Sequence, residues 1–262
     1  MQKALFTAAS GMKCQQAYID TVANNLANVN TTGFKASQLN FQDLLYDQQI
    51  LPGTEATQGN QVPTGLEVGS GVRIASSSKL FKQGDLEQTS GQLDMAIQGS
   101  GFFRVQMPDG TLAYTRAGAM GLDGNRRLVT TDGLPLADNV SLPNNAASVS
   151  LASDGKVYVS VPGSTEQQLV GSVTLAGFAN PSGLKSLGAN LLAETVASGA
   201  ATTGTPGQNG LGTLQQGYLE KSNVDVVTEL VRLITAQRAY EINTKAISIA
   251  DQMLQEANAL IR

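Results

Sequence analysis

The stretch "SNVDVVTELVRLITAQRAYEINTKAISIADQMLQEANALIR", residues 222–262, carries the most regular pattern in the chain. Apolar residues recur in it at every seventh position without interruption, and small residues hold the matching d-type positions. The first column consists of Val226, Leu233, Tyr240, Ile247, Leu254 and Ile261, and the second includes Ala236, Ala250 and Ala257. Such a heptad repeat predicts a long helix that packs along another helix. Ser222 or Asn223 can cap its start, because Ser222-x-x-Asp225 has the spacing of a capping box.

A shorter copy of this pattern lies near the N-terminus, where Leu5, Met12, Ile19 and Leu26 recur every seven residues. We therefore predict that the two terminal helices form a coiled coil. At about 1.5 Å per residue, a first helix that ends near residue 29 spans roughly 42 Å, and a second helix from about residue 224 to 262 spans roughly 58 Å. The C-terminal helix is thus expected to extend beyond its partner.

The apolar face of the longer helix is also wide, because Ala239, Ala246, Met253 and Leu260 form a further column beside the first. An intramolecular coiled coil that closes a single domain is the simpler alternative, but it leaves part of this face uncovered. Contiguous exposed apolar surface marks association sites. The pattern therefore favours burial of the helices by neighbouring copies, and repeating one such contact without closure builds a helical filament.

Between the helices, residues of about 68 to 220 have the pattern of β-structure. In "GFFRVQMPDGTLAYTR", residues 101–116, the apolar residues Phe103, Val105 and Met107 alternate up to an Asp-Gly turn, after which the alternation resumes. Further Asp-Gly turns lie at 123–124, 132–133 and 154–155. These turns predict a compact antiparallel β-domain. The expected fold class is α+β, mainly β, with terminal α-helices that form a coiled coil and a central antiparallel β-domain.

The predicted parts are an N-terminal coiled-coil helix at 1–32, a connector and extended arm at 33–72, a β-rich outer domain at 73–220 and a C-terminal coiled-coil helix at 221–262. Segment 46–72 has little apolar periodicity, and its prolines and glycines are also typical of a disordered linker. Its spaced apolar residues instead favour an arm that lies along a neighbouring copy, since long segments of this kind are often functional. The arm residues are Ile50, Leu51, Val62, Leu66 and Val68.

Composition excludes several classes of function. The 262-residue chain has a net charge of -4, so it lacks the basic field that nucleic acid or anionic lipid requires, and we expect neither as a partner. It has no His, and its single Cys cannot form an internal disulfide, so we expect no catalytic residues, no cofactor and no metal site. No apolar run is long enough to span a membrane, and the N-terminal apolar run is too short for a secretory signal. We expect no membrane insertion and a mature N-terminus.

Three stretches together resemble the flagellar axial family of rod and hook proteins. "NNLANVNTTGFKAS", residues 24–37, looks like the N-terminal signature of that family, and residues 222–254 look like its C-terminal signature. "LDMAIQGSGFFRVQMPDGTLAYTRAGAM", residues 93–120, is similar to the start of its β-domain. The resemblance covers nearly the whole chain. The N-terminal signature residues are Asn24, Asn25, Asn28, Asn30, Gly33 and Phe34.

The resemblance implies a structural role. Proteins of this family pair their terminal helices into the inner coiled-coil core of a hollow tube, with the β-domain outside. The signature asparagines would then satisfy backbone and neighbouring polar groups where the helix gives way to the connector. Gly33 would permit the turn, and Phe34 would anchor it. Ordinary helix-stop residues with no contact beyond the chain are the alternative for each asparagine.

The partners that the resemblance implies are further copies of this chain, the proximal rod proteins, the hook protein, the surrounding L and P ring proteins and the flagellar export apparatus. It implies export without a cleaved signal peptide and a place in the periplasm-spanning rod of the basal body. The tube would transmit motor torque to the hook and let exported subunits pass.

Within the family, the length of the chain and segment 45–72 favour a distal rod subunit over a proximal rod or hook subunit. An enzyme is the alternative from another class, for instance a periplasmic glycan hydrolase with two carboxylates in a cleft. None of the 21 Asp and Glu residues stands in a recognisable catalytic setting, so the sequence favours the structural role.

Overall fold

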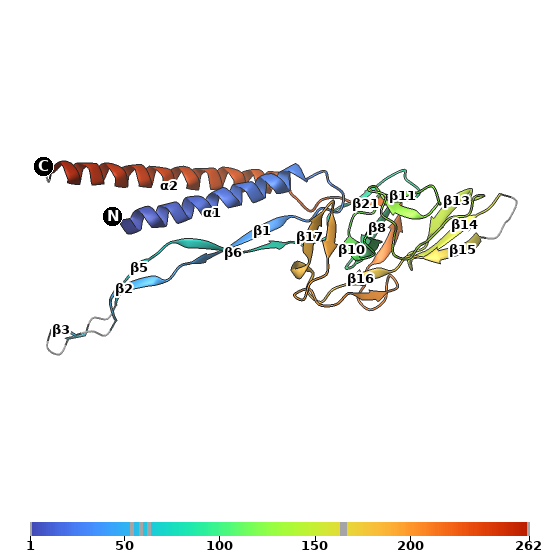
Figure 1. Cartoon of the computed structure of the whole chain (residues 1–262), viewed down its shortest axis with the longest axis horizontal. Coiled ribbons are helices and arrows are strands. Elements are labelled where there is room, and N and C mark those ends of the chain that lie inside the picture. Colours follow the sequence, from blue (N-terminus) through green and yellow to red (C-terminus); the bar gives the residue numbers. More distant parts are fainter. Residues whose placement is uncertain (1, 53–54, 58–59, 62–63, 163–166, 261–262) are drawn as a thin grey trace. The chain divides into compact units, whose positions relative to one another are not determined.

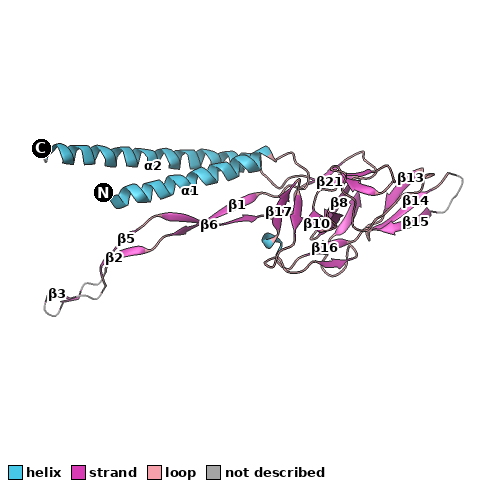
Figure 2. Cartoon of the chain, in the orientation of Figure 1, coloured by secondary structure: helices cyan, strands magenta, loops and turns pink. Residues whose placement is uncertain are grey.

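The computed structural model describes residues 2–52, 55–57, 60–61, 64–162 and 167–260. These residues form a helix at each end of the chain and many short strands between them (Figure 2). The predicted fold class, α+β and mainly β, is confirmed. Contacts divide the chain into two compact units. The first comprises Met1–Leu26, Ser37–Ser78 and Asp225–Arg262, and the second comprises Ala27–Ala36 and Lys79–Val224.

The first unit contains both helices, α1 at Gln2–Ala27 and α2 at Val226–Leu260, which run alongside each other (Figure 1). Neither helix contains proline, so no interior hydrogen bond of either is removed by its sequence. The predicted heptad residues fall within these two helices, except Ile261, which lies outside the described residues.

The start of α2 is capped by Asp225. Its Oδ1 accepts a hydrogen bond from the Val227 backbone N–H at 3.2 Å, and its Oδ2 accepts one from the Thr228 hydroxyl at 2.5 Å. The prediction that Ser222 or Asn223 caps this helix is wrong. The Asn223 amide is engaged with backbone groups of the second unit, so the next residue with a suitable oxygen takes over the cap.

The remaining residues of the first unit form narrow two-stranded ribbons. The strand pairs are β1 (Ser37–Asp43) with β6 (Val72–Lys79), β2 (Tyr46–Ile50) with β5 (Leu66–Gly69), and β3 (Glu55–Thr57) with β4 (Asn60–Gln61). β2 and β5 are antiparallel, with Tyr46 opposite Gly69. The described residues of segment 46–72 thus include paired strands. The alternative interpretation, a disordered linker, predicts no strands in this segment. Residues 73–78 of β6, which the predicted boundaries assigned to the outer domain, group with the first unit.

The ribbon of β1 and β6 packs on α1. The rings of Tyr18 and Phe41 meet edge to face with centroids 5.8 Å apart. Ser10 Oγ accepts a hydrogen bond from the Val72 N–H at 3.3 Å. Gly71 lies so close to α1 that a Cβ added there would stand 2.3 Å from Ser10 Oγ, and its φ of +112° is one that other residues rarely adopt. Glycine at this position lets the ribbon approach the helix.

The second unit is built from antiparallel strands. Its largest sheet has six strands in the order β17 (Lys185–Gly188), β18 (Leu191–Ala193), β10 (Leu112–Thr115), β9 (Phe102–Gln106), β16 (Leu175–Gly177) and β19 (Thr202–Gly204). A three-stranded sheet joins β13 (Ser148–Leu151), β14 (Lys156–Ser160) and β15 (Gln167–Ser172). Three pairs complete it: β11 (Met120–Leu122) with β12 (Leu128–Thr130), β20 (Thr213–Gln216) with β8 (Met95–Gln98), and β21 (Tyr218–Glu220) with β7 (Leu86–Gln88). A short 3-10 helix lies at Pro181–Gly183.

Three of the predicted Asp-Gly turns connect paired strands. The turn at 109–110 joins β9 to β10, the turn at 123–124 joins β11 to β12, and the turn at 154–155 joins β13 to β14. The fourth, at 132–133, directly follows β12. Gly110 and Gly155 have φ of +82° and +87°, the conformation for which glycine is selected in such turns.

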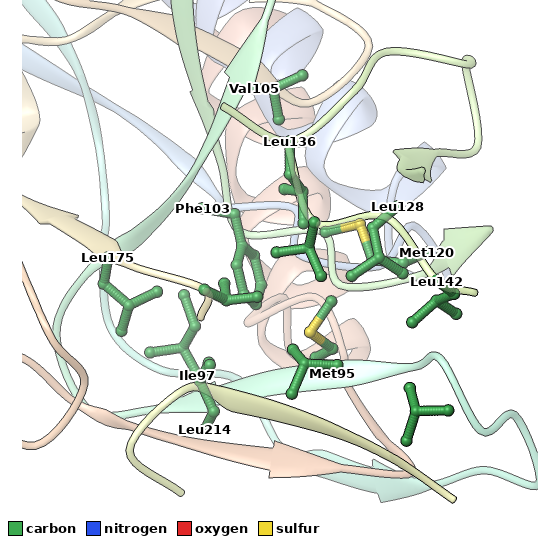
Figure 3. Close-up of a cluster of buried hydrophobic side chains, with 14 residues drawn as sticks. Met95, Ile97, Phe103, Val105, Met120, Leu128, Leu136, Leu142, Leu175 and Leu214 are labelled. Atoms are coloured by element: carbon green, nitrogen blue, oxygen red, sulfur yellow. The ribbon is translucent and has the colours of Figure 1, made fainter. Parts of the chain in front are cut away.

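The main core of the second unit lies under β9 and its neighbours (Figure 3). Phe103, Val105 and Leu175 are fully buried there. The alternation in the sequence predicts one buried face for β9, but Phe102 is buried as well. It belongs to a second cluster on the opposite face, where its ring contacts the ring of Phe178. Apolar residues therefore cover both faces of this strand, which makes it a central element of the fold.

Candidate self-assembly surface

The contact between α1 and α2 is lined by small and polar residues. Ala236 and Ala250 are buried on α2, in the column that the sequence marked as d-type. Gly11 of α1 lies against Asn243, since a Cβ on Gly11 would stand 3.2 Å from the Asn243 amide nitrogen. Near this point the Thr244 hydroxyl lies 3.4 Å from Met12 Sδ. Small side chains let the two helix backbones approach each other along this column.

The predicted large apolar columns lie beside this contact. On α1 the predicted residues Leu5, Met12, Ile19 and Leu26 are all half-buried. On α2 the residues Leu233, Ile247 and Leu254 are half-buried, whereas Val226 and Tyr240 are exposed. Ile261 lies outside the described residues. Much of both columns is therefore still open to a partner when the chain is alone.

The face of α2 that points away from this contact is apolar and exposed. Its large side chains are 48–69% exposed, and they follow one another at intervals of three, four, seven and eight residues, so that they share one face. Ile234 comes two residues before Ala236 and so lies roughly 200° around the helix from it. We call this face the α2 stripe, formed by Val227, Val231, Ile234, Ile242, Ile249 and Met253.

Sequence reasoning found only part of this stripe. The further column predicted beside the first includes Met253, but it follows the heptad spacing and so misses the other five residues of the stripe. The stripe repeats at close to the natural 3.6-residue turn of a straight helix, whereas a heptad search looks for 3.5. A search for apolar residues that recur with the 3.6-residue period of a straight α-helix would have found the whole stripe. Leu260, the last residue of the predicted column, lies in α2, but its side chain is not among those that the structure describes.

The arm at β2 and β5 also exposes apolar residues. Leu45, Tyr46, Ile50, Leu51 and Leu66 are 43–89% exposed, and Val68 is half-buried. Val62, the remaining predicted arm residue, lies outside the described residues. A two-stranded ribbon is only marginally stable alone in water. Apolar side chains on such a ribbon are thus a candidate contact for another chain.

Among the signature residues, Asn25 is the most deeply buried, at 1% exposed. Its Oδ1 accepts the Ser37 N–H at 2.9 Å, and its Nδ2 donates to the Ser37 carbonyl at 2.9 Å. Nδ2 also lies 3.5 Å from Oε2 of Glu229, a buried residue in the first turn of α2. Asn25 therefore joins α1, β1 and α2 in the first unit. The role of Glu229 is not visible in the sequence, because acidic residues in a first helical turn are usually exposed.

The other signature residues belong to the exit of α1 and the connector. Asn24 and Asn30 are exposed, and the half-buried Asn28 accepts a hydrogen bond from the Thr31 hydroxyl at 3.1 Å. Gly33 has a φ of +69°, and a Cβ there would stand 2.5 Å from the backbone nitrogen of Ala117. This glycine is needed both for the turn and for the close packing.

Phe34 is buried in a small apolar cluster of the second unit. Ala36 and Val224 are the other buried members, and Val29 packs against them. The Asn223 Oδ1 accepts the Ala36 N–H at 2.8 Å, and its Nδ2 donates to the Leu80 carbonyl at 2.7 Å. The connector is thus fixed on the second unit by an aromatic side chain and by one amide. From the sequence, Asn223 is predicted only as a possible cap of the C-terminal helix.

Beneath the connector lies a buried charge cluster that the sequence did not reveal. Glu220 is fully buried, its Oε1 accepts a hydrogen bond from Lys35 Nζ at 2.5 Å, and its Oε2 accepts one from Arg116 Nη1 at 3.3 Å. The Gly84 N–H donates to the same carboxylate at 3.0 Å. Burial lowers the pKa of Lys35, against the opposing effect of Glu220. Charged residues usually lie on the surface, so no pattern in the sequence marks these three as buried.

Among the described residues, no group of three or more His, Cys, Asp or Glu side chains is arranged to hold a metal ion. In the same part of the chain, neither helix is both long enough and apolar enough to cross a membrane. The exposed features of the first unit are instead apolar faces on elongated elements. Their chemistry is that of association rather than of a reaction centre.

Comparison with known proteins identifies the family. The family model described as "Flagella basal body rod protein" matches residues 5–35, "Flagellar hook protein FlgE/F/G D1 domain" matches residues 96–159, and "Flagellar basal body rod FlgEFG protein C-terminal" matches residues 215–260. The flagellar basal-body rod protein FlgG of Borreliella burgdorferi is 46% identical over 100% of both chains. The chain belongs to the FlgG family of flagellar basal-body rod proteins.

Two further FlgG proteins give the same result. FlgG of Buchnera aphidicola from Acyrthosiphon pisum is 47% identical over 99% of this chain and 100% of its own. FlgG of Caulobacter vibrioides is 46% identical over 98% of this chain and 99% of its own. This FlgG-family chain is a structural axial subunit of the flagellum, located in the basal body with other flagellar components, and it is not an enzyme. The glycan hydrolase alternative is therefore wrong.

Proposed function

We propose that the chain is a subunit of the distal rod that assembles with further copies, through its terminal helices, into a rigid hollow helical tube. The observation that carries this proposal is the α2 stripe, which faces away from α1 and has no cover among the described residues. From Val227 to Met253 the stripe spans about 39 Å at 1.5 Å per residue. Monomeric proteins rarely leave so long an apolar face in water.

The partner that fits the stripe is a helix of a neighbouring copy. α1 offers the half-buried column at Leu5, Met12 and Ile19, and Phe6 beside it is 74% exposed. A contact between the stripe of one copy and α1 of the next uses two different surfaces. Repeated without closure, such a heterologous contact builds a helical tube. The proposed helix-core residues are thus the two heptad columns together with the α2 stripe.

In this role the tube would span the periplasm, transmit motor torque to the hook and let exported subunits pass along its interior. Its neighbours would be the proximal rod proteins at one end, the hook protein at the other and the L and P ring proteins around it. The subunit would reach its place through the flagellar export apparatus without a cleaved signal peptide. The family membership of the chain and its matching terminal segments support these assignments.

The arm is proposed as a second contact between copies. Its apolar residues Ile50, Leu51 and Leu66 are exposed, and the adjoining ribbon is anchored on α1 through Ser10 and Val72. Since one end of the arm is fixed on a core helix, its contacts with a neighbouring copy would couple the cores of the two copies. This coupling would make the tube straight and stiff.

Electron microscopy of the concentrated protein tests the proposal. The wild-type chain should form tubes, and Ile242→Asp should abolish them, because a carboxylate in a buried apolar contact costs several kcal/mol per copy. Gln255→Asp is the matched control, since it adds the same charge to an exposed position of α2 that lies roughly 200° around the helix from Met253. Ile242 is 66% exposed, so circular dichroism of the monomer should not change in either variant. Tubes formed by Ile242→Asp, or monomers of the wild-type chain at every concentration, would contradict the proposal.

A further inference from the structure

A small cavity lies beneath residues 33–35 in the second unit. Its volume is about 10 Å³, which leaves room for a single water-sized particle. Backbone and apolar side chains form part of its wall, and three cationic side chains form the rest. The lining residues are Gly33, Phe34, Lys35, Lys79, Phe81, Arg116, Asn190 and Leu192.

The charges around this cavity do not balance. Lys35 and Arg116 share a single carboxylate, that of Glu220. Lys79 faces the ring of Phe34, with its Nζ 5.8 Å from the centroid. Burial alone lowers the pKa of Lys79, and in the part of the chain that the structure describes no carboxylate acts on it. Three cations and one anion leave two positive charges in excess.

Arg116 has, in addition, an unmet hydrogen bond. Its Nη2 donates to the Gly99 carbonyl at 2.7 Å, and its Nη1 lies near Glu220 and the Ile97 carbonyl. Its Nε has no partner among the described residues, although the side chain is only 5% exposed. Buried charges and donors are costly when they lack partners. A negatively charged ligand in the cavity would offset this cost.

We propose that the cavity binds one small monovalent anion between Lys35, Lys79 and Arg116. Its size admits a halide ion or a single carboxylate oxygen but no phosphate or sulfate group. The same chemistry has two sources, a free chloride ion or the carboxylate of an Asp or Glu side chain from a neighbouring copy. This inference goes beyond the proposed function, because the binding of a free ion does not depend on assembly.

The test compares the thermal unfolding of the monomer in sodium chloride and in sodium methanesulfonate at equal ionic strength, since methanesulfonate is too large for the cavity. Above the dissociation constant, each tenfold rise in chloride should raise the unfolding midpoint by roughly 3–5 °C. Lys79→Met should lose this dependence while keeping an apolar stem in place. Lys82→Met is the matched control, because Lys82 is exposed and does not line the cavity, and it should behave as the wild type.

Chlorine NMR gives a second readout, which detects the bound ion directly. Chloride exchanging with a protein site broadens the line, and bromide added as a competitor should narrow it again. Loss of the broadening on assembly would assign the cavity to a carboxylate of the next copy, whereas broadening that persists would assign it to the free ion. Equal midpoints in the two salts, together with the same line width in the wild type and Lys79→Met, would overturn the proposal.

Discussion

The side-chain amide of Asn25 pairs with the backbone of Ser37 through both of its polar groups, each at 2.9 Å. An asparagine amide has the same donor and acceptor as a peptide group, so it pairs with the first residue of β1 as a strand residue would. The site is shielded from water, since Asn25 is 1% exposed. This geometry explains why an asparagine, rather than another helix-stop residue, stands at position 25.

Asn25→Asp tests this pairing. The carboxylate cannot donate to the Ser37 carbonyl, and it would face Glu229 Oε2, which lies 3.5 Å from Nδ2 in the wild type. A buried carbonyl left without its donor costs about 1–3 kcal/mol, and repulsion between the two carboxylates adds to it. We expect hydrogen exchange at the Ser37 amide to accelerate by at least about fivefold.

Asn24→Asp is the control for this experiment, because it makes the same change at the adjacent exposed residue. It should leave the exchange of the Ser37 amide within about twofold of the wild type. Equal exchange in both variants would mean that the pairing with Asn25 does not hold the start of β1.

Gly71→Ala should separate the ribbon from α1. The added Cβ would stand 2.3 Å from Ser10 Oγ, and the φ of +112° strains any residue with a side chain. We expect the Val72 amide, which donates to Ser10 Oγ, to exchange faster and the ribbon to become sensitive to limited proteolysis. Gly121→Ala is the control, since a Cβ there has nothing within 4 Å and no positive φ is involved. Protection of Val72 that survives in Gly71→Ala would show that the ribbon can shift without leaving the helix.

These two sites show how far the sequence alone could lead. The run of asparagines and Gly33 correctly indicates where α1 ends, because helix-stop chemistry is local. The partner of Asn25 lies 12 residues away, and that of Gly71 lies 61 residues away on α1. Such contacts depend on tertiary packing, which leaves no local pattern in the sequence.

The same limit applies to the helices and to the buried charges. Heptad spacing predicts that α2 packs on another helix, and the d-type alanines at 236 and 250 are indeed buried. The spacing does not tell which apolar face remains open, because that depends on where α1 lies. Lys35 and Glu220 are 185 residues apart, and their burial follows only from the folded second unit. The Asp-Gly turns were predictable because a turn is specified by adjacent residues.

The buried Lys35 predicts an unusual pH dependence of stability. Its pKa is lowered in the folded chain by burial, whereas in the unfolded chain it returns to about 10.5. Between the lowered pKa and 10.5, the folded chain has released a proton that the unfolded chain still binds. Stability rises with pH wherever the unfolded state binds more protons. We therefore expect the free energy of unfolding to increase with pH across this window.

Urea unfolding at a series of pH values measures this effect. Lys35→Met should remove most of the increase, and Lys82→Met should retain it, since Lys82 is exposed. Burial lowers the pKa of Lys79 too, so a smaller increase should remain in Lys35→Met. Tyr114 acts in the opposite direction, because its raised pKa makes the fold lose stability once the pH passes about 10. A stability that falls steadily from neutral pH up to pH 10 would contradict the assignment.

The arm provides a test of the origin of stiffness in the tube. Bending a helical tube requires neighbouring copies to slide past each other, and a contact that bridges copies beyond the helices resists this sliding. Tyr46, Ile50, Leu51 and Leu66 are exposed on the arm, so their replacement removes apolar contact area without opening the core of the subunit. A variant with Thr at all four positions keeps the β-propensity that the pairing of β2 with β5 needs.

We expect this fourfold variant to form tubes that are curved or more flexible than those of the wild type, seen directly by electron microscopy. Deletion of residues 47–63 should have the same effect, with the packing of the helices intact. Gln49→Thr is the matched control, because it changes an exposed residue of β2 without removing apolar area, and its tubes should stay straight. Failure of the fourfold variant to assemble would mean that the arm is part of the primary contact between copies. Straight and equally stiff tubes from both the fourfold variant and the deletion would show that the segment is only a linker, because a contact that holds copies in register cannot be removed without easing their sliding.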